Sequence, residues 1–504
     1  MSEDRRISRE RLEGHPGEIY TRTILKPSYD FMLEHYFEGL IQANKAWTVM
    51  LAERDIIPED TAAGLLDAIR SLEADGRDGM GEFDPQVEYF YSTMERYLIA
   101  RVGETIAGDI NIGRTRPEPL VRIVMRDRLI ETMRGVLALR EQLLALAEAH
   151  RDTVMPLGTH MQHAQITTLG HYLVGMINAL ERDLDRLLAA WHRCNFCTLG
   201  CGALAGSSYD IDRDRVAELL GFEGLIENTN DCVGAGDYML ESVAALANLM
   251  TTVSRLCQDF YIWHTQEFGY ISIGDDYSGS SSMMPQKKNP YPFEYSRFTA
   301  THVIGEMTGA FASLHNVNYQ DTKDVEEGLA PPVFRALSET TAILDLLTGV
   351  FSTVEVDAEA MKRQAARHFA SCTELAAVIH RATDLSFRSA HRIVGNLVLR
   401  AIRQGKDATQ VDAALVNESA QDVLGRDLPL DDAMVSGALD PESFVQSHTV
   451  KGGPAREPLQ AALAEAGERA RADRERVDAL ADGLDTADTT LNTAVEQWLQ
   501  GRVA

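Results

Sequence analysis

Apolar residues recur through the middle of the chain with the period of an α-helix. Residues 237–268 contain neither proline nor glycine, and their apolar positions are three and four apart, as in Leu246, Leu249, Met250, Val253, Leu256, Cys257 and Phe260. Similar patterns predict helices near 119–151, 160–190, 295–314 and 332–350. Five long helices indicate an all-α fold built around a helix bundle.

The two ends of the chain differ from this middle part. Residues 1–110 show shorter helical segments, and residues from about 355 onward show short helices and a loop near 450–454. Residues 457–499 are highly charged, which we interpret as a helix exposed to solvent. Strand-like alternation is rare, and Tyr270-Ile-Ser-Ile is its best example. We predict an N-terminal helical domain (1–112), a central bundle domain with a catalytic loop (113–355) and a C-terminal helical domain (356–504).

The length of the central helices predicts self-association. A helix of about 30 residues is about 45 Å long, which exceeds the diameter of a small domain. Broad apolar faces on such helices favour pairing with other copies of the chain. The alternative is a large monomer in which the terminal segments cover the bundle.

Composition narrows the possible partners. The 504 residues carry a formal net charge of -28, which repels nucleic acid, and no run of lysine and arginine opposes it. We expect no membrane partner, because the chain has no long apolar stretch and its first residues do not resemble a secretory signal. Six cysteines are too few for a disulfide scaffold, so we expect a cytoplasmic protein.

One polar loop, residues 274–290, stands out from the helical pattern. It combines glycines and serines with Lys287, Lys288 and Asn289, and it lies between two predicted long helices. Hydroxyl, amide and ammonium groups together suit the binding of a carboxylate or a developing oxyanion. On composition alone, a solvated serine-rich linker is an equal alternative.

Motifs in and around this loop carry a family resemblance. Ser281-Ser-Met-Met-Pro-Gln-Lys-Lys-Asn-Pro290 resembles the signature of the fumarase/aspartase superfamily, and its Gln-Lys-Lys-Asn-Pro part resembles the argininosuccinate lyase branch. Four further blocks resemble the same family in the expected order: Gly113-Arg-Thr-Arg116, Leu157-Gly-Thr-His-Met-Gln-His-Ala-Gln165, Leu199-Gly-Cys-Gly-Ala-Leu-Ala-Gly206 and Arg388-Ser-Ala-His-Arg-Ile-Val-Gly395.

The resemblance implies a fold and an activity. Members of this family have three-domain all-α subunits that form a homotetramer with a 20-helix core, and each active site draws on three subunits. They need no cofactor. A member of this branch is expected to eliminate fumarate reversibly from an N-succinyl amine by anti elimination across a C–N bond. The alternatives are an ethylenediamine-disuccinate-type lyase, another superfamily reaction such as hydration or cycloisomerisation, and a non-catalytic protein of the crystallin type.

The resemblance also assigns roles to individual residues. Ser281 corresponds to the serine base, with Lys287 and Asn289 binding the substrate carboxylate. His160 corresponds to the general acid for the leaving nitrogen, oriented by Glu294.

Further residues of the matching blocks are expected to bind the dicarboxylate substrate. Thr159 is expected to bind one carboxylate, and Thr115 and Arg116 the other. The same blocks contribute Gln162, Met284 and Arg114, although Arg114 could equally form a structural ion pair.

The chain departs from the family pattern on the amine side of the substrate. Pro117 replaces an asparagine, and Asn318, Lys323 and Glu326 stand where argininosuccinate lyases have tyrosine, glutamine and lysine; a shift of one residue would make Tyr319 the tyrosine. The identity of the amine therefore stays open.

A cysteine cluster offers a separate possibility. His192, Cys194, Cys197 and Cys201 resemble metal-ligand spacing, but a second Cys-x-x-Cys is missing. We favour simple burial of these thiols, with no metal site, over a metal or redox protein built on the cluster.

Overall fold

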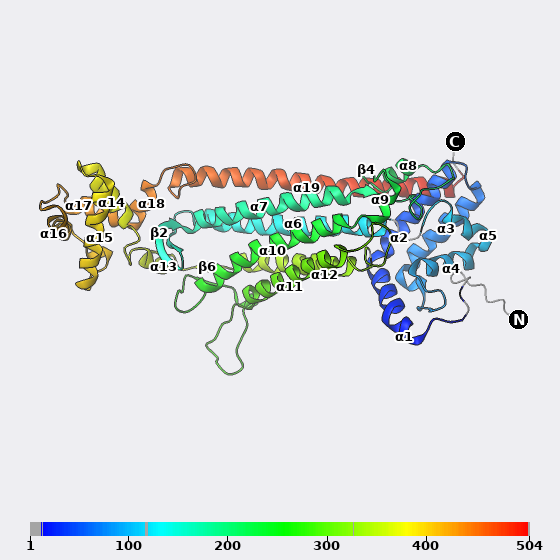
Figure 1. Ribbon diagram of the computed structural model, residues 1–504, viewed down its shortest axis with the longest axis horizontal. Helices are drawn as coiled ribbons and strands as arrows, with labels where there is room; N and C mark the ends of the chain where they lie inside the picture. Colours follow the sequence, from blue (N-terminus) through cyan, green and yellow to red (C-terminus); the bar gives the residue numbers. More distant parts are fainter. Residues whose placement is uncertain (1–11, 13, 116–118, 326, 502–504) are drawn as a thin grey trace.

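The protein is an elongated bundle of long helices with smaller groups of helices at both ends (Figure 1). The computed structural model describes residues 12, 14–115, 119–325 and 327–501. The bundle contains five long helices, as predicted: α6 (Leu120–Ala149), α7 (Leu169–Cys194), α10 (Asp237–Trp263), α11 (Tyr291–Leu314) and α12 (Ala330–Phe351). Each buries apolar side chains in one continuous core, so the prediction of an all-α bundle fold is confirmed.

The predicted helix at 160–190 begins later than expected, and that prediction is wrong over its first turns. Strands β1 (Val154–Thr159) and β2 (Gln162–Thr168) instead form an antiparallel hairpin before α7. His160 and Met161, the two turn residues, have φ values of 54° and 59°. Positive φ at both central positions matches the right-handed twist of a hairpin and is incompatible with a right-handed helix.

The charged C-terminal segment is also different from our interpretation. Helix α19 (Arg456–Leu499) runs the length of the bundle and packs against α6 and α7 rather than standing in solvent. Its apolar residues, spread thinly among charges, join the main core: Leu459, Leu463, Ala466, Val477, Leu491, Val495 and Trp498. Asp473 pairs at 2.7 Å with Arg140 of α6, whose side chain is fully buried.

The N-terminal part contains a longer helix than the sequence indicated. Helix α2 (Lys26–Glu53) has 28 residues and buries Trp47 completely. Helices α3 (Glu59–Asp75) and α4 (Phe90–Val102) pack beside it. Together these helices cover one end of the bundle (Figure 1).

The opposite end carries a separate group of helices. The buried residues of α14 (Cys372–Ala382), α15 (Phe387–Arg403), α16 (Ala413–Leu424) and α17 (Asp432–Leu439) form an apolar cluster apart from the main core. Because α19 returns to the main core, the chain crosses the bundle once more after these helices. The domain boundaries at 112/113 and 355/356 stay a prediction.

Short elements complete the structure. The remaining α-helices are α1 (Glu18–Tyr20), α5 (Glu104–Ala107), α8 (Arg213–Leu219), α9 (Thr229–Gly234), α13 (Ala358–Ala365) and α18 (Pro441–Ser447). Strand β3 (Phe196–Cys197) pairs parallel with β4 (Gly224–Leu225), and β5 (Ile271–Ser272), the strand expected at 270–273, pairs antiparallel with β6 (Glu355–Val356). Within the described part of the chain, every helix is too short or too polar to cross a membrane.

Candidate active site

The loop 274–290 connects β5 to α11 and projects from the side of the bundle (Figure 1). Two backbone hydrogen bonds close its neck, from Gly279 N to Asn289 O at 2.8 Å and from Asn289 N to Gly279 O at 2.9 Å. The Asn289 side chain is buried there and donates to the Gly279 carbonyl at 3.1 Å. A Cβ atom on Gly279 would lie 2.0 Å from the ring of Tyr291, so this neck requires glycine.

The hydroxyl of Ser281 lies in a turn of this loop where backbone N–H groups face it. The Oγ atom accepts hydrogen bonds from Met284 N at 3.0 Å and from Met283 N at 3.4 Å. Such donors stabilise negative charge on the oxygen more than on a neutral hydroxyl. Lys287, three residues beyond Met284, is exposed. The turn therefore directs two backbone N–H donors at Ser281 Oγ.

Glu294 occupies the first turn of α11, near the end of the loop. Its carboxylate accepts a hydrogen bond from the Tyr261 hydroxyl at 3.1 Å. Within the described part of one chain, no hydrogen bond or ion pair joins Glu294 to His160. The expected Glu–His pair is therefore not formed inside a single subunit.

The predicted site residues of the 157–165 motif lie at the tip of the β1–β2 hairpin. Thr159, His160 and Gln162 are all exposed, and Gln162 Nε2 donates to the neighbouring Met161 carbonyl at 3.1 Å. The twist of the hairpin turns these polar side chains toward solvent at one end of the bundle. A site that uses them needs groups from elsewhere.

The described residues of the 113–116 motif lie at the other end of the bundle. Arg114 donates to Asn44 Oδ1 and to the Tyr91 hydroxyl, and its guanidinium lies 5.6 Å from the ring of Trp47. These hydrogen bonds and aromatic rings hold its guanidinium in place. Thr115 borders a large cavity, whereas Arg116 lies outside the described residues.

This cavity, of about 790 Å³, is lined by α2, by the start of α4 and by residues 321–331. Five of the residues that line it are aromatic: Phe31, Tyr36, Tyr89, Phe90 and Tyr91.

The polar groups of the cavity centre on an ion pair between Lys323 and Glu327. Ser28 Oγ donates to the other oxygen of Glu327 at 3.1 Å, and Lys323 Nζ lies 5.4 Å from the centre of the Tyr89 ring. Burial lowers the pKa of Lys323, but the hydrogen bond and charge of Glu327 outweigh it, so the pKa is raised. Sequence reasoning singled out Lys323 and missed Glu327, although their i,i+4 spacing was a signal. Glu326 lies outside the described residues.

The length of α6 separates two of the predicted groups within one chain. Thr115 precedes this 30-residue helix by five positions, and β1 begins five positions after it. A helix of that length spans about 45 Å. Thr115 and His160 of one subunit therefore cannot contact one small substrate.

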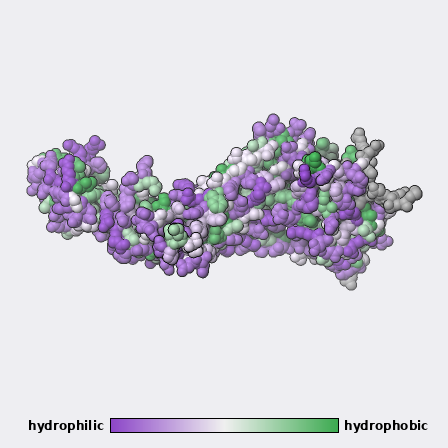
Figure 2. Space-filling view, turned by 90° about the horizontal axis from the view of Figure 1, so that it is seen from below, coloured by the Kyte–Doolittle hydropathy of each residue, from purple (hydrophilic) through white to green (hydrophobic). Residues whose placement is uncertain are grey.

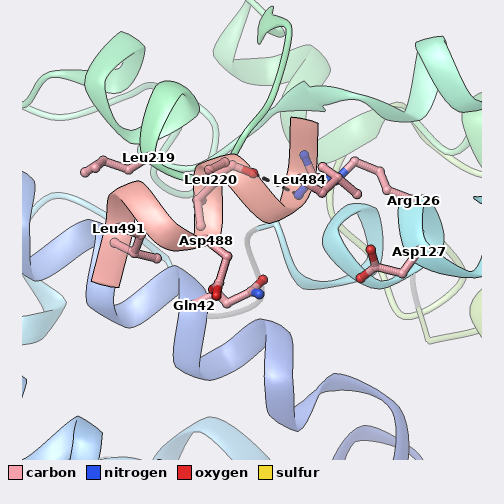
Figure 3. A pocket seen from close by; sticks show the side chains of 9 residues that line it. Gln42, Arg126, Asp127, Leu219, Leu220, Leu484, Asp488 and Leu491 are labelled. Carbon is pink, nitrogen blue, oxygen red and sulfur yellow. Dashed lines mark hydrogen bonds between the residues drawn. The ribbon is translucent and has the colours of Figure 1, made fainter. Parts of the chain in front are cut away.

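A second cavity, between α2, α6 and α19, is too small for such a substrate. It has a volume of about 30 Å³, enough for one water molecule, and Gln42, Asp127 and Asp488 border it (Figure 3). Arg126 beside it donates to the Leu220 carbonyl at 2.9 Å, which marks a structural role. Burial raises the pKa of Asp127 to about 6.

The cysteine cluster has no metal-binding geometry in the part of the chain that the structure describes, where no group of three or more His, Cys, Asp or Glu side chains could hold an ion. Cys194, Cys197 and Cys201 are buried. Burial raises the pKa of Cys194 to about 11, and its thiol donates to the Arg122 carbonyl at 3.6 Å. His192 Nδ1 lies 2.8 Å from the carboxylate of Glu223 instead.

Comparisons with known proteins agree along most of the chain. A family model described as Lyase matches residues 13–305, and one described as Argininosuccinate lyase C-terminal matches residues 369–446. The argininosuccinate lyase of Methanothermobacter thermautotrophicus is 37% identical over 86% of this chain and 92% of its own. That of Methanosarcina acetivorans is 32% identical over 98% and 99%. The crystal structure of EDDS lyase in complex with formate has a TM-score of 0.87 and 30% identity, and the match covers 97% of both chains.

Proposed function

The chain belongs to the argininosuccinate lyase family of the fumarase/aspartase superfamily, and from this premise we propose that it eliminates fumarate from an N-succinyl amine or amino acid. The protein is a carbon–nitrogen lyase. The reaction removes a proton from the carbon beside a carboxylate and breaks the C–N bond on the opposite face. The same chemistry runs in reverse when fumarate and the amine are supplied.

The observation that carries the proposal is that two backbone N–H groups donate hydrogen bonds to Ser281 Oγ. A serine hydroxyl is a weak base, and it becomes effective only where its alkoxide is stabilised. The N–H groups of Met283 and Met284 supply part of that stabilisation. Lys287 and Asn289 bind the substrate carboxylate, so that negative charge spreads over the carboxylate as the proton leaves.

The leaving nitrogen takes its proton on the other side of the substrate. His160 acts as the general acid, directly or through water, and Glu294 of another subunit fixes the imidazole tautomer and raises its basicity. Thr159 and Gln162 bind the substrate beside His160. Thr115 and Arg116 bind the second carboxylate.

A homotetramer with shared active sites follows from this assignment. Helix α11 exposes a row of large apolar side chains, namely Tyr291, Tyr295, Phe298, Ile304 and Phe311, whose exposed fractions run from 40% to 56%. Green and pale patches interrupt the hydrophilic surface along the bundle in the view from below (Figure 2). Burying such a face against copies of the chain removes apolar surface from water and brings hairpin, loop and cavity together. We place the protein in the cytoplasm, which its six thiols and absence of disulfides support.

The amine leaves into the large cavity beside Thr115. Lys323 there is neutralised by Glu327, while Asp321 adds a carboxylate to the same wall. This arrangement makes N-succinyl amines of the ethylenediamine-disuccinate type the second candidate substrates, after argininosuccinate. Aromatic walls and a carboxylate suit an additional ammonium group on the substrate.

The experiment is a substrate panel with fumarate as the measured product. Purified protein is mixed with argininosuccinate, ethylenediamine disuccinate and other N-succinyl amines, and fumarate is followed by its absorbance and by mass spectrometry. We expect fumarate and free amine in equal amounts from at least one of them. Consumption of substrate with water added and no amine released would favour a hydratase, and the absence of any reaction across the panel would refute the proposal.

A further inference from the structure

Two cysteines that are 31 positions apart in the sequence meet between a tight turn and helix α9. Cys201 lies between Gly200 and Gly202, which have φ values of 89° and 61°. A Cβ atom on Gly202 would lie 2.5 Å from the carbonyl of Gly206, so the turn holds Cys201 in one position. The Cys201 side chain lies within hydrogen-bonding reach of the sulfur of Cys232, the fourth residue of α9.

A guanidinium group lies directly beside this pair. Arg213 Nη2 donates to Cys232 Sγ at 3.2 Å and to the Ile226 carbonyl at 3.0 Å, and Nε donates to the Leu199 carbonyl at 3.2 Å. In the described part of the chain its hydrogen-bond partners are backbone carbonyls and this sulfur, with no carboxylate among them. Its positive charge is therefore available to a thiolate at Cys232.

The hydrogen bonds can rearrange when Cys232 loses its proton. As a thiol, Cys232 donates to the Ile226 carbonyl at 3.3 Å, and Cys201 Sγ lies 3.3 Å from the Gly202 carbonyl. As a thiolate, Cys232 accepts from Cys201 and from Arg213. The hydrogen bond from Cys201 and the charge of Arg213 overcome the effect of burial and lower the pKa of Cys232 to about 7.

Two thiols elsewhere in the chain have pKa values shifted in the opposite direction. Burial raises the pKa of Cys372 to about 12 and that of Cys257 to about 12. Cys372 is half-buried, as Cys232 is, which makes it an internal control of similar exposure.

We propose that Cys201 and Cys232 form a peroxide-sensitive thiol pair that closes reversibly to a disulfide. In the first step the Cys232 thiolate attacks hydrogen peroxide; an S–O bond forms, the O–O bond breaks, and hydroxide leaves with a cysteine sulfenic acid on the protein. In the second step Cys201 sulfur attacks that sulfenic sulfur; an S–S bond forms, the S–O bond breaks, and the Cys201 proton leaves with the oxygen as water. A dithiol reductant reverses the change.

The proposal goes beyond the lyase reaction and does not depend on it, because it is read out on the thiols. Full-length protein is treated at pH 7 with equimolar hydrogen peroxide, and each cysteine is quantified by differential alkylation and mass spectrometry. We expect Cys201 and Cys232 to be lost together, with a linked peptide that dithiothreitol removes. We expect Cys232 to react roughly 10²-fold faster than Cys372, because its much larger thiolate fraction outweighs the lower nucleophilicity of a less basic sulfur.

Two variants make the result decisive. In Cys201→Ala, Cys232 should form a sulfenic acid that a dimedone-type probe traps, with no linked peptide. Cys372→Ser, the matched control, should oxidise as the wild-type protein does. Equal reaction rates at Cys232 and Cys372, or oxidation of Cys232 to sulfinic acid in the wild-type protein without a disulfide, would overturn the proposal.

Discussion

Mixing two inactive variants should restore part of the activity, because we propose that the loop and the hairpin of one site come from different chains. The Ser281→Ala chain keeps an intact hairpin, and the His160→Asn chain keeps an intact loop. Each is expected to lose nearly all activity alone. The fold supports this expectation, because within the described part of one chain Glu294, beside the loop, bonds to Tyr261 and not to His160 of the hairpin.

The size of the recovery follows from random assembly. In an equal mixture, half of the loops and half of the hairpins are intact, so about a quarter of the sites receive both. The two chains are co-expressed with different tags, hybrids are isolated by both tags, and fumarate formation is measured with the substrate identified from the panel.

A matched pair of loop variants provides the control. Ser281→Ala mixed with Asn289→Ala should show no recovery, because every site then receives a loop with one defect or the other. Isolated hybrids of the Ser281→Ala and His160→Asn chains that stay as inactive as their parents would refute the shared site.

Three further changes test the packing and the cavity. Asp127→Asn should raise the free energy of unfolding at pH 8 by less than about 1 kcal/mol, because the folded pKa of Asp127 is raised to about 6 but the residue is exposed and solvent screens the effect. This group stabilises the fold below pH 4, and that contribution is lost as pH rises through 6; an unchanged pH slope in urea unfolding would contradict this. Asp473→Ala should lower the free energy of unfolding by about 3–5 kcal/mol, because it leaves the buried Arg140 unpaired; a loss below about 1 kcal/mol would count against it. Glu327→Gln should shift the ratio of kcat/KM values about tenfold toward leaving amines that carry a carboxylate, because Lys323 loses its partner; competition between two substrates measures that ratio, and no shift would disprove the role of the pair.

The sequence was most informative where one residue type repeats with a helical period. The apolar positions of α10 and the loop of glycines and serines before α11 predicted both elements and their order. The loop motif also located Ser281, whose N–H partners come from residues two and three positions ahead. Local spacing was sufficient in these cases because the interactions are local.

The sequence was less informative where the deciding contacts are distant in the chain. The hairpin at 154–168 depends on two residues with positive φ, His160 and Met161, which are not typical turn residues. Helix α19 looked solvated because its few apolar residues are separated by charges, and only α6 and α7 reveal that they form one buried face. The cavity beside Thr115 joins segments about 300 residues apart, which no single motif encodes.

The most direct measurement compares fumarate formation by Ser281→Ala with that by Ser278→Ala. Ser278 belongs to the same loop, but its hydroxyl donates to the Gly274 carbonyl at 2.8 Å. Loss of the base should lower kcat by about 10²–10⁴-fold in Ser281→Ala, with substrate still bound, whereas Ser278→Ala should stay within about tenfold of the wild-type protein. Fumarate formation by Ser281→Ala at the wild-type rate would contradict the central claim, that an activated serine removes the proton.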